Sequence, residues 1–144
     1  MPQKFLKSIG AASDKLADDW LTSPWGKLNN RLDLLDKIHF AKNKKPTGVN
    51  RGDLLVLYAA GWERIFGIAV VMSDEPQQLI VPGQERWPWV LDVTVPLVVP
   101  RLSLAPTLAE IKVANTSVRQ QSHIHLTDER YALAVAALTR RVQP

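Results

Sequence analysis

The sequence predicts an α+β fold, with a curved antiparallel sheet or open β-barrel flanked by helices. Two apolar runs of strand length, Leu54–Tyr58 and Arg64–Met72, lie on either side of a turn marked by Gly61, as in a β-hairpin. Helical patterns precede and follow the strand candidates. The order is strand, two helices, several strands, a helical turn, a strand and a terminal helix, which is typical of such a domain.

The first third of the chain predicts one strand and two helices. Lys4–Ile9 is a short strand, and Ser13 is an N-cap for a helix that runs to about Leu21. Asn30, with Asp33 three residues later, resembles the cap of a second helix. Its apolar stripe is Leu28, Leu32, Leu35 and Ile38.

The central part predicts the sheet. Leu54–Tyr58 is apolar throughout, as in a strand covered on both faces. Gly67 permits a bulge or a close backbone approach within the next strand. Val90–Val99 is a further strand, and Pro96 indicates that it ends there or lies at an edge of the sheet.

The last third predicts a helical turn, a brief strand and a helix. Thr107 and Glu110 form a capping-box pattern after Pro106. His123–Leu126 alternates as a strand does, and Thr127 caps the final helix. The apolar face of that helix is Tyr131, Val135, Leu138 and Val142.

Composition indicates one globular domain spanning residues 1–144. Hydrophobic residues make up 46% of the sequence and charged residues 22%, close to the average for globular proteins. The absence of cysteine excludes disulfides, thiolate catalysis and cysteine-based zinc sites. Residues 1–10 are too polar for a signal peptide and no apolar run reaches membrane-spanning length, so we expect a soluble, cytoplasmic protein without a membrane partner.

Several short motifs follow one another in an order that resembles a known family. They are Lys7-Ser8, Trp20 with Trp25, Arg51-Gly52-Asp53 before LLVLY, FGIAVV before Ser73, WPWVLDV from Trp87, Pro106-Thr107-Leu108, and Ser117–Ser122. In this order they resemble the EVE domain of the PUA-like superfamily, which is related to the YTH and ASCH domains. The resemblance spans nearly the whole chain.

The resemblance implies a function as well as a fold. Domains of this superfamily have a compact barrel that takes a modified or flipped base into a cleft beside the first strands. YTH domains hold methylated adenine in a tryptophan cage, and EVE-type domains are associated with modified DNA bases. The implied function is therefore a DNA-binding or RNA-binding module that reads a modified, for example methylated, base, with DNA favoured over RNA.

Tryptophans are the candidates for the walls of that pocket. Trp25, Trp62, Trp87 and Trp89 lie beside glycine or proline at the ends of predicted elements, where pockets form. Stacking a base on an aromatic ring contributes about 1–3 kcal/mol. Stacking on two walls can therefore offset the few kcal/mol that base flipping costs. Trp25 and Trp62 are the favoured walls, because Trp20 and Trp89 are equally consistent with the core and Trp87 with covering a sheet edge.

Polar side chains are needed to read the edge of the base, because stacking alone tolerates any base. The predicted base-binding residues are Ser8, Trp25, Asn30, Asp53, Trp62, Trp87 and Gln121. Asp53 has an alternative role as a turn residue that accepts hydrogen bonds from backbone amides before a strand. Asn30 can equally be a helix cap.

Basic residues are the candidates for phosphate contacts, each of which makes binding more sensitive to salt. The segment Lys37–Arg51 carries five lysines and arginines and no carboxylate, within a chain of net charge +4. The predicted phosphate-binding residues are Lys7, Lys42, Lys44, Lys45, Arg51, Arg64 and Arg119.

Catalytic chemistry is not indicated. His123 and His125 alternate on a strand and face one side, but the sequence places no third metal ligand beside them. We therefore predict a binding module without catalytic residues, metal or cofactor. Two alternatives remain: an ASCH-like enzyme acting on nucleosides or RNA through Lys7, Asp53 and Arg64, and a protein-interaction domain with exposed tryptophans.

Overall fold

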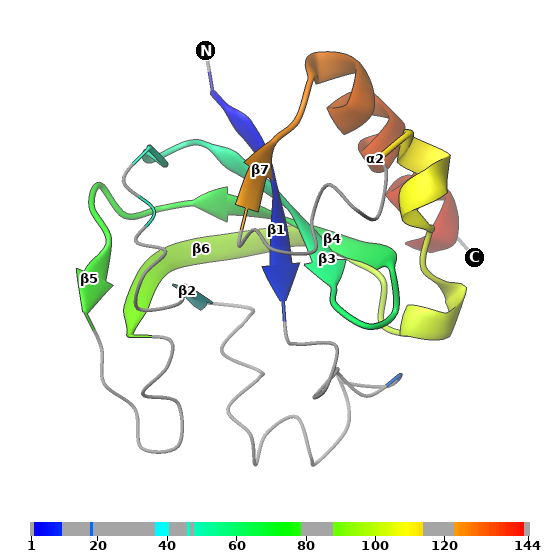
Figure 1. Cartoon of the computed structure of the whole chain (residues 1–144), viewed down its shortest axis with the longest axis horizontal. Coiled ribbons are helices and arrows are strands. Elements are labelled where there is room, and N and C mark those ends of the chain that lie inside the picture. The colour runs from blue at the N-terminus through cyan, green and yellow to red at the C-terminus, as the bar shows by residue number, and fades with distance from the viewer. Residues whose placement is uncertain are drawn as a thin grey trace.

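The structure is a computed structural model, and it describes residues 2–9, 18, 37–40, 46, 48–78, 88–113 and 123–142. The strands are β1 (Lys4–Ile9), β2 (Lys37–Phe40), β3 (Leu54–Ala59), β4 (Arg64–Val71), β5 (Gln77–Gln78), β6 (Trp89–Val98) and β7 (His123–His125) (Figure 1). The helices are the 3₁₀ turns η2 (Leu102–Leu104) and η3 (Leu108–Ile111) and the α-helix α2 (Asp128–Val142).

The strands form one mixed sheet in the order β2-β6-β4-β3-β1-β7, with β5 paired to β6. The prediction of an antiparallel sheet is wrong for one pair, because β1 runs parallel to β3, from Lys4 beside Leu54 to Ile9 beside Ala59. Parallel neighbours need a long connection, and the chain between β1 and β3 is long enough to provide one. The strand predictions for Lys4–Ile9 and for the central hairpin are confirmed.

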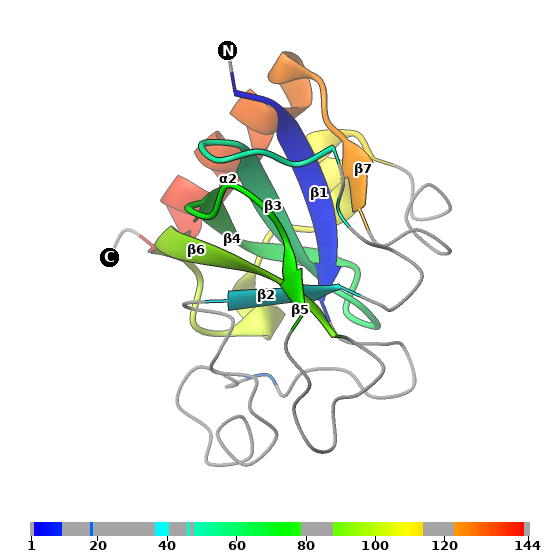
Figure 2. The ribbon, with the colours of Figure 1, turned by 90° about the vertical axis from the view of Figure 1, so that its left-hand side faces the viewer.

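The sheet is strongly curled. In β6, one extra residue lies between the pairs Ile68–Leu97 and Val70–Thr94, and such a bulge bends a strand and increases its twist. Figure 2 shows β2 running almost crosswise to β1 and β3. The described residues therefore have an α+β fold with an open, curved sheet.

Pro96 lies within this bulge and does not end the strand, which continues to Val98. Its position agrees with the edge alternative, because β2 pairs only with residues 89–92 of β6. The missing amide hydrogen of Pro96 therefore removes no bond from the β2–β6 ladder.

Gly67 makes the close backbone approach that the sequence predicts. A Cβ atom at Gly67 would lie 2.9 Å from the Leu97 carbonyl oxygen of β6. The register between β3 and β4 also shifts beside it, so that Leu57 pairs with Gly67 and Tyr58 with Ile65. The pairing of β4 with β6 thus depends on the missing side chain, whereas a Cβ would meet Leu57 of β3 at an ordinary 3.5 Å.

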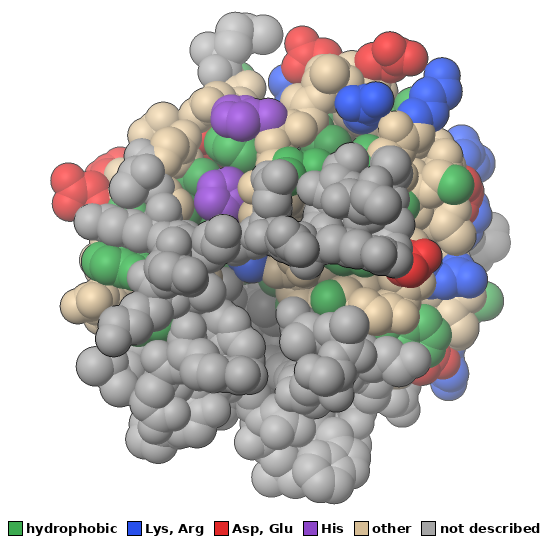
Figure 3. Space-filling model, viewed as in Figure 1, with side chains coloured by type: hydrophobic (Ala, Val, Ile, Leu, Met, Phe, Trp, Pro, Cys, Tyr) green, Lys and Arg blue, Asp and Glu red, His purple; other side chains and the backbone are tan. Residues whose placement is uncertain are grey.

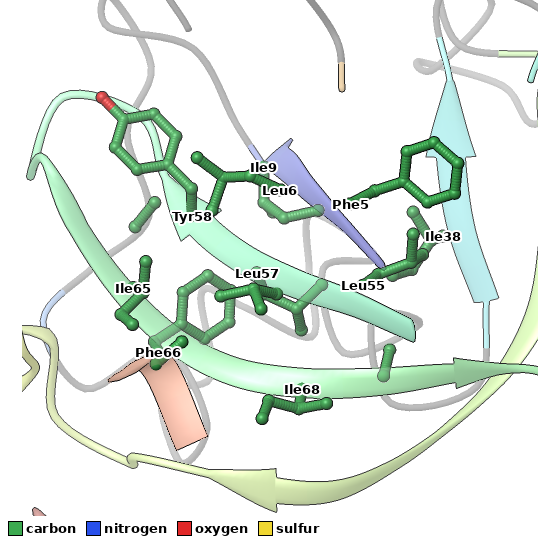
Figure 4. Packing of buried hydrophobic residues seen from close by; sticks show 14 of the residues in the cluster. Phe5, Leu6, Ile9, Ile38, Leu55, Leu57, Tyr58, Ile65, Phe66 and Ile68 are labelled. Carbon is green, nitrogen blue, oxygen red and sulfur yellow. The ribbon is translucent and has the colours of Figure 1, made fainter. Parts of the chain in front are cut away.

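The core fills the inside of the curl and the space between the sheet and α2. Leu55, Leu57, Phe66 and Ile68 are fully or almost fully buried (Figure 4). β3 is buried from Leu55 to Ala59, which agrees with its predicted cover on both faces.

The C-terminal elements begin as their capping patterns predict. The Glu110 carboxylate accepts a hydrogen bond from the Thr107 amide at 2.8 Å, and this bond is the main reason why the pKa of Glu110 is lowered. The Arg130 amide donates to the Thr127 hydroxyl at 3.1 Å at the start of α2. The predicted apolar face of α2 is wrong at Val142, which is 38% exposed, whereas the buried residues of the helix are Ala134, Ala137 and Leu138.

One predicted helix is wrong at its end. Ile38 belongs to β2, where it pairs with Leu91 of β6, and is not part of a helical stripe. The rest of that predicted helix, and the helix predicted to end near Leu21, lie outside the described residues except for Asp18. Among the helices that the structure describes, none is long and apolar enough to cross a membrane.

We predict that Gly67→Ala destabilises the protein by about 1–3 kcal/mol, because the added methyl group meets backbone that must shift. Urea titration followed by circular dichroism measures the change. Gly48→Ala is the matched control, since a Cβ there meets nothing within 4 Å. Equal stability of both variants would contradict the close packing of β4 on β6.

Candidate functional site

The candidate site centres on Lys7, a lysine whose surface is only 5% exposed. Side chains alternate along β1, so Phe5 and Lys7 lie on the same face. On β7, His123 is opposite Lys7 and His125 is opposite Phe5, so the four side chains share one face. Figure 4 shows Phe5 pointing toward Ile38 of β2, which places this face inside the curl.

Aromatic rings surround the Lys7 side chain. The ammonium lies 4.6 Å from the centre of the Phe40 ring, within cation–π distance. Phe40 meets His123 edge to face at 5.4 Å, and Phe5 lies 5.7 Å from His123 and 4.5 Å from His125. We call these five residues, Phe5, Lys7, Phe40, His123 and His125, the Lys7 site.

The outer side of the Lys7 site reaches the surface at β7. Figure 3 shows histidine side chains gathered there, on the face seen in Figure 1. His123 is half-buried and His125 is exposed. The site therefore extends from the buried amine toward the surface along an aromatic wall.

The Lys7 amine is buried without an anionic partner among the described residues. Its Nζ atom donates a hydrogen bond to the Ser8 carbonyl oxygen at 2.5 Å. Burial alone lowers the pKa of Lys7 from 10.5 to about 7. Buried charges in proteins are usually paired, so an unpaired amine in this place is suited to a ligand.

Ser8 follows Lys7 on β1, whereas Trp62 lies in the β3–β4 hairpin tip, next to the end of that strand. Ser8 points to the opposite face of β1 from Lys7 and pairs with Tyr58 of β3, while its carbonyl oxygen holds the amine. Trp62 is half-buried at the tip of the β3–β4 hairpin and packs against the core. This tip lies beside the end of β1, because the Ala60 amide donates to the Ile9 carbonyl oxygen at 2.9 Å.

Asp53 has the turn role that the sequence left open. It is 4% exposed and accepts hydrogen bonds from the Gln3 amide at 2.9 Å, the Gln3 side chain at 3.0 Å and the Asn50 amide at 2.8 Å. Both carboxylate oxygens thus hold the turn before β3 against the start of β1. These contacts favour the turn role over base reading.

The two described arginines among the predicted phosphate contacts differ. Arg51 is exposed, donating to the Met72 carbonyl oxygen at 2.9 Å and lying 3.3 Å from Asp74. Arg64 is half-buried and donates to the Ala105 carbonyl oxygen at 2.6 Å. Arg64 therefore ties the hairpin to the segment before η3, whereas Arg51 faces solvent.

The catalytic alternative through Lys7, Asp53 and Arg64 is not assembled. Lys7 lies beside Leu57, four residues along β3 from Asp53, which corresponds to about 13 Å. Arg64 pairs with Ala59, farther along in the same direction. The three side chains are thus spread along the strands and do not converge.

The other predicted site residues lie outside the described residues. They are Trp25, Asn30, Trp87 and Gln121 for the base, and Lys42, Lys44, Lys45 and Arg119 for phosphate. Among the side chains that the structure does describe, no three histidine or acidic residues are grouped as a metal site requires.

Sequence reasoning missed the aromatic partners of Lys7. The alternation of Ile38 and Phe40 in KIHF was a strand signal, but it was assigned to the end of a helical stripe. Phe5 and Lys7 of β1 are also two residues apart, as Ile38 and Phe40 are, so they too lie on one face of their strand. The expectation that His123 and His125 face one side agrees with the strand register.

The comparisons with known proteins bear on the fold. No family model matches the sequence, and no curated protein matches it significantly. The structure is similar to a protein from Agrobacterium tumefaciens, with a TM-score of 0.57, 13% identity and coverage of 94% of this chain and 92% of the other.

Two further solved structures are similar over nearly their whole length. A hypothetical protein from Leishmania major has a TM-score of 0.57 and 14% identity, with coverage of 99% of this chain and 98% of the other. A protein from Rhodopseudomonas palustris has a TM-score of 0.55 and 17% identity, with coverage of 99% and 96%. These chains share the fold of an α+β domain with an open, curved sheet.

We predict that Lys7→Met raises the free energy of unfolding by about 2–5 kcal/mol at pH 6, because it removes a buried charge. The folded protein releases the Lys7 proton near pH 7 and the unfolded chain only near pH 10.5. Because the unfolded chain binds more protons between these values, the wild type gains stability as pH rises through this window. The advantage of the variant therefore shrinks toward pH 10.

Urea titrations of the wild type and Lys7→Met at pH 6, 7.5 and 9 measure this effect. Lys112→Met is the control, because the Lys112 side chain is 67% exposed and its ion pair with Glu129 lies on the surface. A difference between the wild type and Lys7→Met that does not change with pH would contradict the buried amine.

We predict that Asp53→Ala destabilises the fold by about 1–3 kcal/mol, because it leaves the amides of Gln3 and Asn50 without their acceptor. Thermal unfolding measures this loss. A stability of Asp53→Ala equal to that of the wild type would contradict the turn role.

Proposed function

We propose that this chain is an EVE-type, PUA-like domain that binds nucleic acid and accepts a modified base, for example a methylated one, into the Lys7 site. One observation carries the proposal: Lys7 is a buried amine among aromatic rings, with no carboxylate partner in the described part of the chain. The order of motifs along the sequence supports the family, and the open, curved sheet is consistent with it.

The chemistry of the Lys7 site suits a flat, polar ligand. A base can stack on His123, which is half-buried, whereas Phe40 is fully buried and its ring is perpendicular to that of His123. Stacking on one ring contributes about 1–3 kcal/mol, to be set against the few kcal/mol needed to unstack the base. The rings alone would accept any base, whereas the amine supplies hydrogen-bond donors. The proposed ligand therefore combines an aromatic ring with an acceptor.

In this proposal, Arg51 and the lysines that precede it in the sequence contact the phosphates. Arg51 is exposed, and in the sequence it ends the basic segment that contains Lys42, Lys44 and Lys45. The burial of Lys7 favours a role at the base, so we move Lys7 from the phosphate-binding group to the base-binding group. DNA remains the favoured nucleic acid.

Binding is favoured over catalysis, because Lys7, Asp53 and Arg64 are spread along the strands. The side chains of Asp53 and Arg64 are also hydrogen-bonded to backbone groups, of Asn50 and Ala105 respectively. Base reading needs only one face of the sheet, and the Lys7 site provides it.

We expect the protein to bind oligonucleotides saturably, with an affinity that falls as salt rises. Titration of matched single- and double-stranded DNA and RNA, with and without methylated bases, measures binding by fluorescence anisotropy at two salt concentrations. Arg51→Gln should weaken binding to all sequences alike and reduce the salt dependence, whereas Lys112→Gln serves as the matched surface control. Absence of saturable binding across the whole panel would overturn the proposed function.

A further inference from the structure

The chemistry of Lys7 also restricts which bases the site can take, if the proposed function is correct. We propose that Lys7 selects bases that present a carbonyl oxygen, as guanine does at O6 and thymine or uracil at O4. Bases that present an amino group at the same edge, adenine and cytosine, are disfavoured. The ligand class is thus a keto base, modified or not.

The donors of Lys7 are the basis of this selection. Below pH 7 the Lys7 amine is protonated, and a lysine ammonium has three N–H donors and no acceptor. The Ser8 carbonyl oxygen accepts one of them, and the Phe40 ring lies against the ammonium on another side. The donors left over need an acceptor from outside the described residues, because no described carboxylate pairs with the amine.

The amino group of adenine or cytosine cannot supply that acceptor. It is itself a donor, so placing it against Lys7 would oppose two donors in a site from which water is largely excluded. A keto oxygen would complete the amine's hydrogen bonding. Sites built to hydrogen-bond one polar group reject analogues that leave their buried groups unpaired.

Geometry also fixes where the selection acts. Lys7 lies in the middle of β1, between Leu57 of β3 and His123 of β7. β3 and β7 are both hydrogen-bonded to β1 on either side of Lys7. The backbone oxygen of Ser8 accepts a hydrogen bond from the Lys7 amine. The strand fixes the start of the Lys7 side chain, and the Ser8 oxygen and the Phe40 ring hold the amine at its end, so the donor has one preferred position.

Pairs of bases that differ only at this edge provide the test. Thymine and 5-methylcytosine differ at position 4 in an oxygen against an amino group, and guanine and 2,6-diaminopurine differ in the same way at position 6. Each base is placed at the centre of an otherwise identical single-stranded oligonucleotide. Dissociation constants are measured at pH 6, where the Lys7 amine keeps its proton, for the wild type, Lys7→Met and the surface control Lys112→Met.

We expect the wild type and Lys112→Met to bind the keto member of each pair at least tenfold more tightly. Lys7→Met should lose this preference while it keeps salt-dependent binding, and circular dichroism checks that it is folded. Equal binding of both members by the wild type, or a preference that survives in Lys7→Met, would overturn the keto selection alone. No binding of any oligonucleotide by the wild type would overturn the proposed function and, with it, this inference.

Discussion

The structure depends on the meeting of the two ends of its sheet. β2 and β7 stand at opposite ends of the strand order, yet Phe40 of β2 contacts His123 of β7 and covers the Lys7 amine. The contact requires the curl, and the curl requires the irregular registers of β4 and β6. Without this closure, the inner face of β1 would lie open and Lys7 would be an ordinary solvated lysine.

Closure places a costly group inside the protein. Moving an amine out of water disfavours its charged form, and the surrounding rings recover only part of that loss through cation–π attraction. The apolar residues of the sheet supply the remaining stability. A chain selected for stability alone would place an aliphatic residue at position 7, and the proposed role of Lys7 in binding would account for the lysine there.

Much of the sheet is predictable from local patterns, whereas the site is not. Leu54–Tyr58 and Arg64–Met72 were recognisable because a fully buried strand is apolar throughout. The caps at Thr107 and Thr127 were recognisable because they involve residues three positions apart. The four-residue β2 and the burial of Lys7 were not, because both depend on partners distant in sequence.

The position of β1 has a consequence for how the protein folds. Its two neighbours are β3 and β7, and the ion pair between Lys4 and Asp128 joins residues 124 positions apart. Contacts between residues so distant in sequence slow folding, because the entropy of closing a long loop is lost before the contact can stabilise the chain. During synthesis, the first strand must wait for almost the whole chain to emerge, so the Lys7 site is among the last parts of the protein to form.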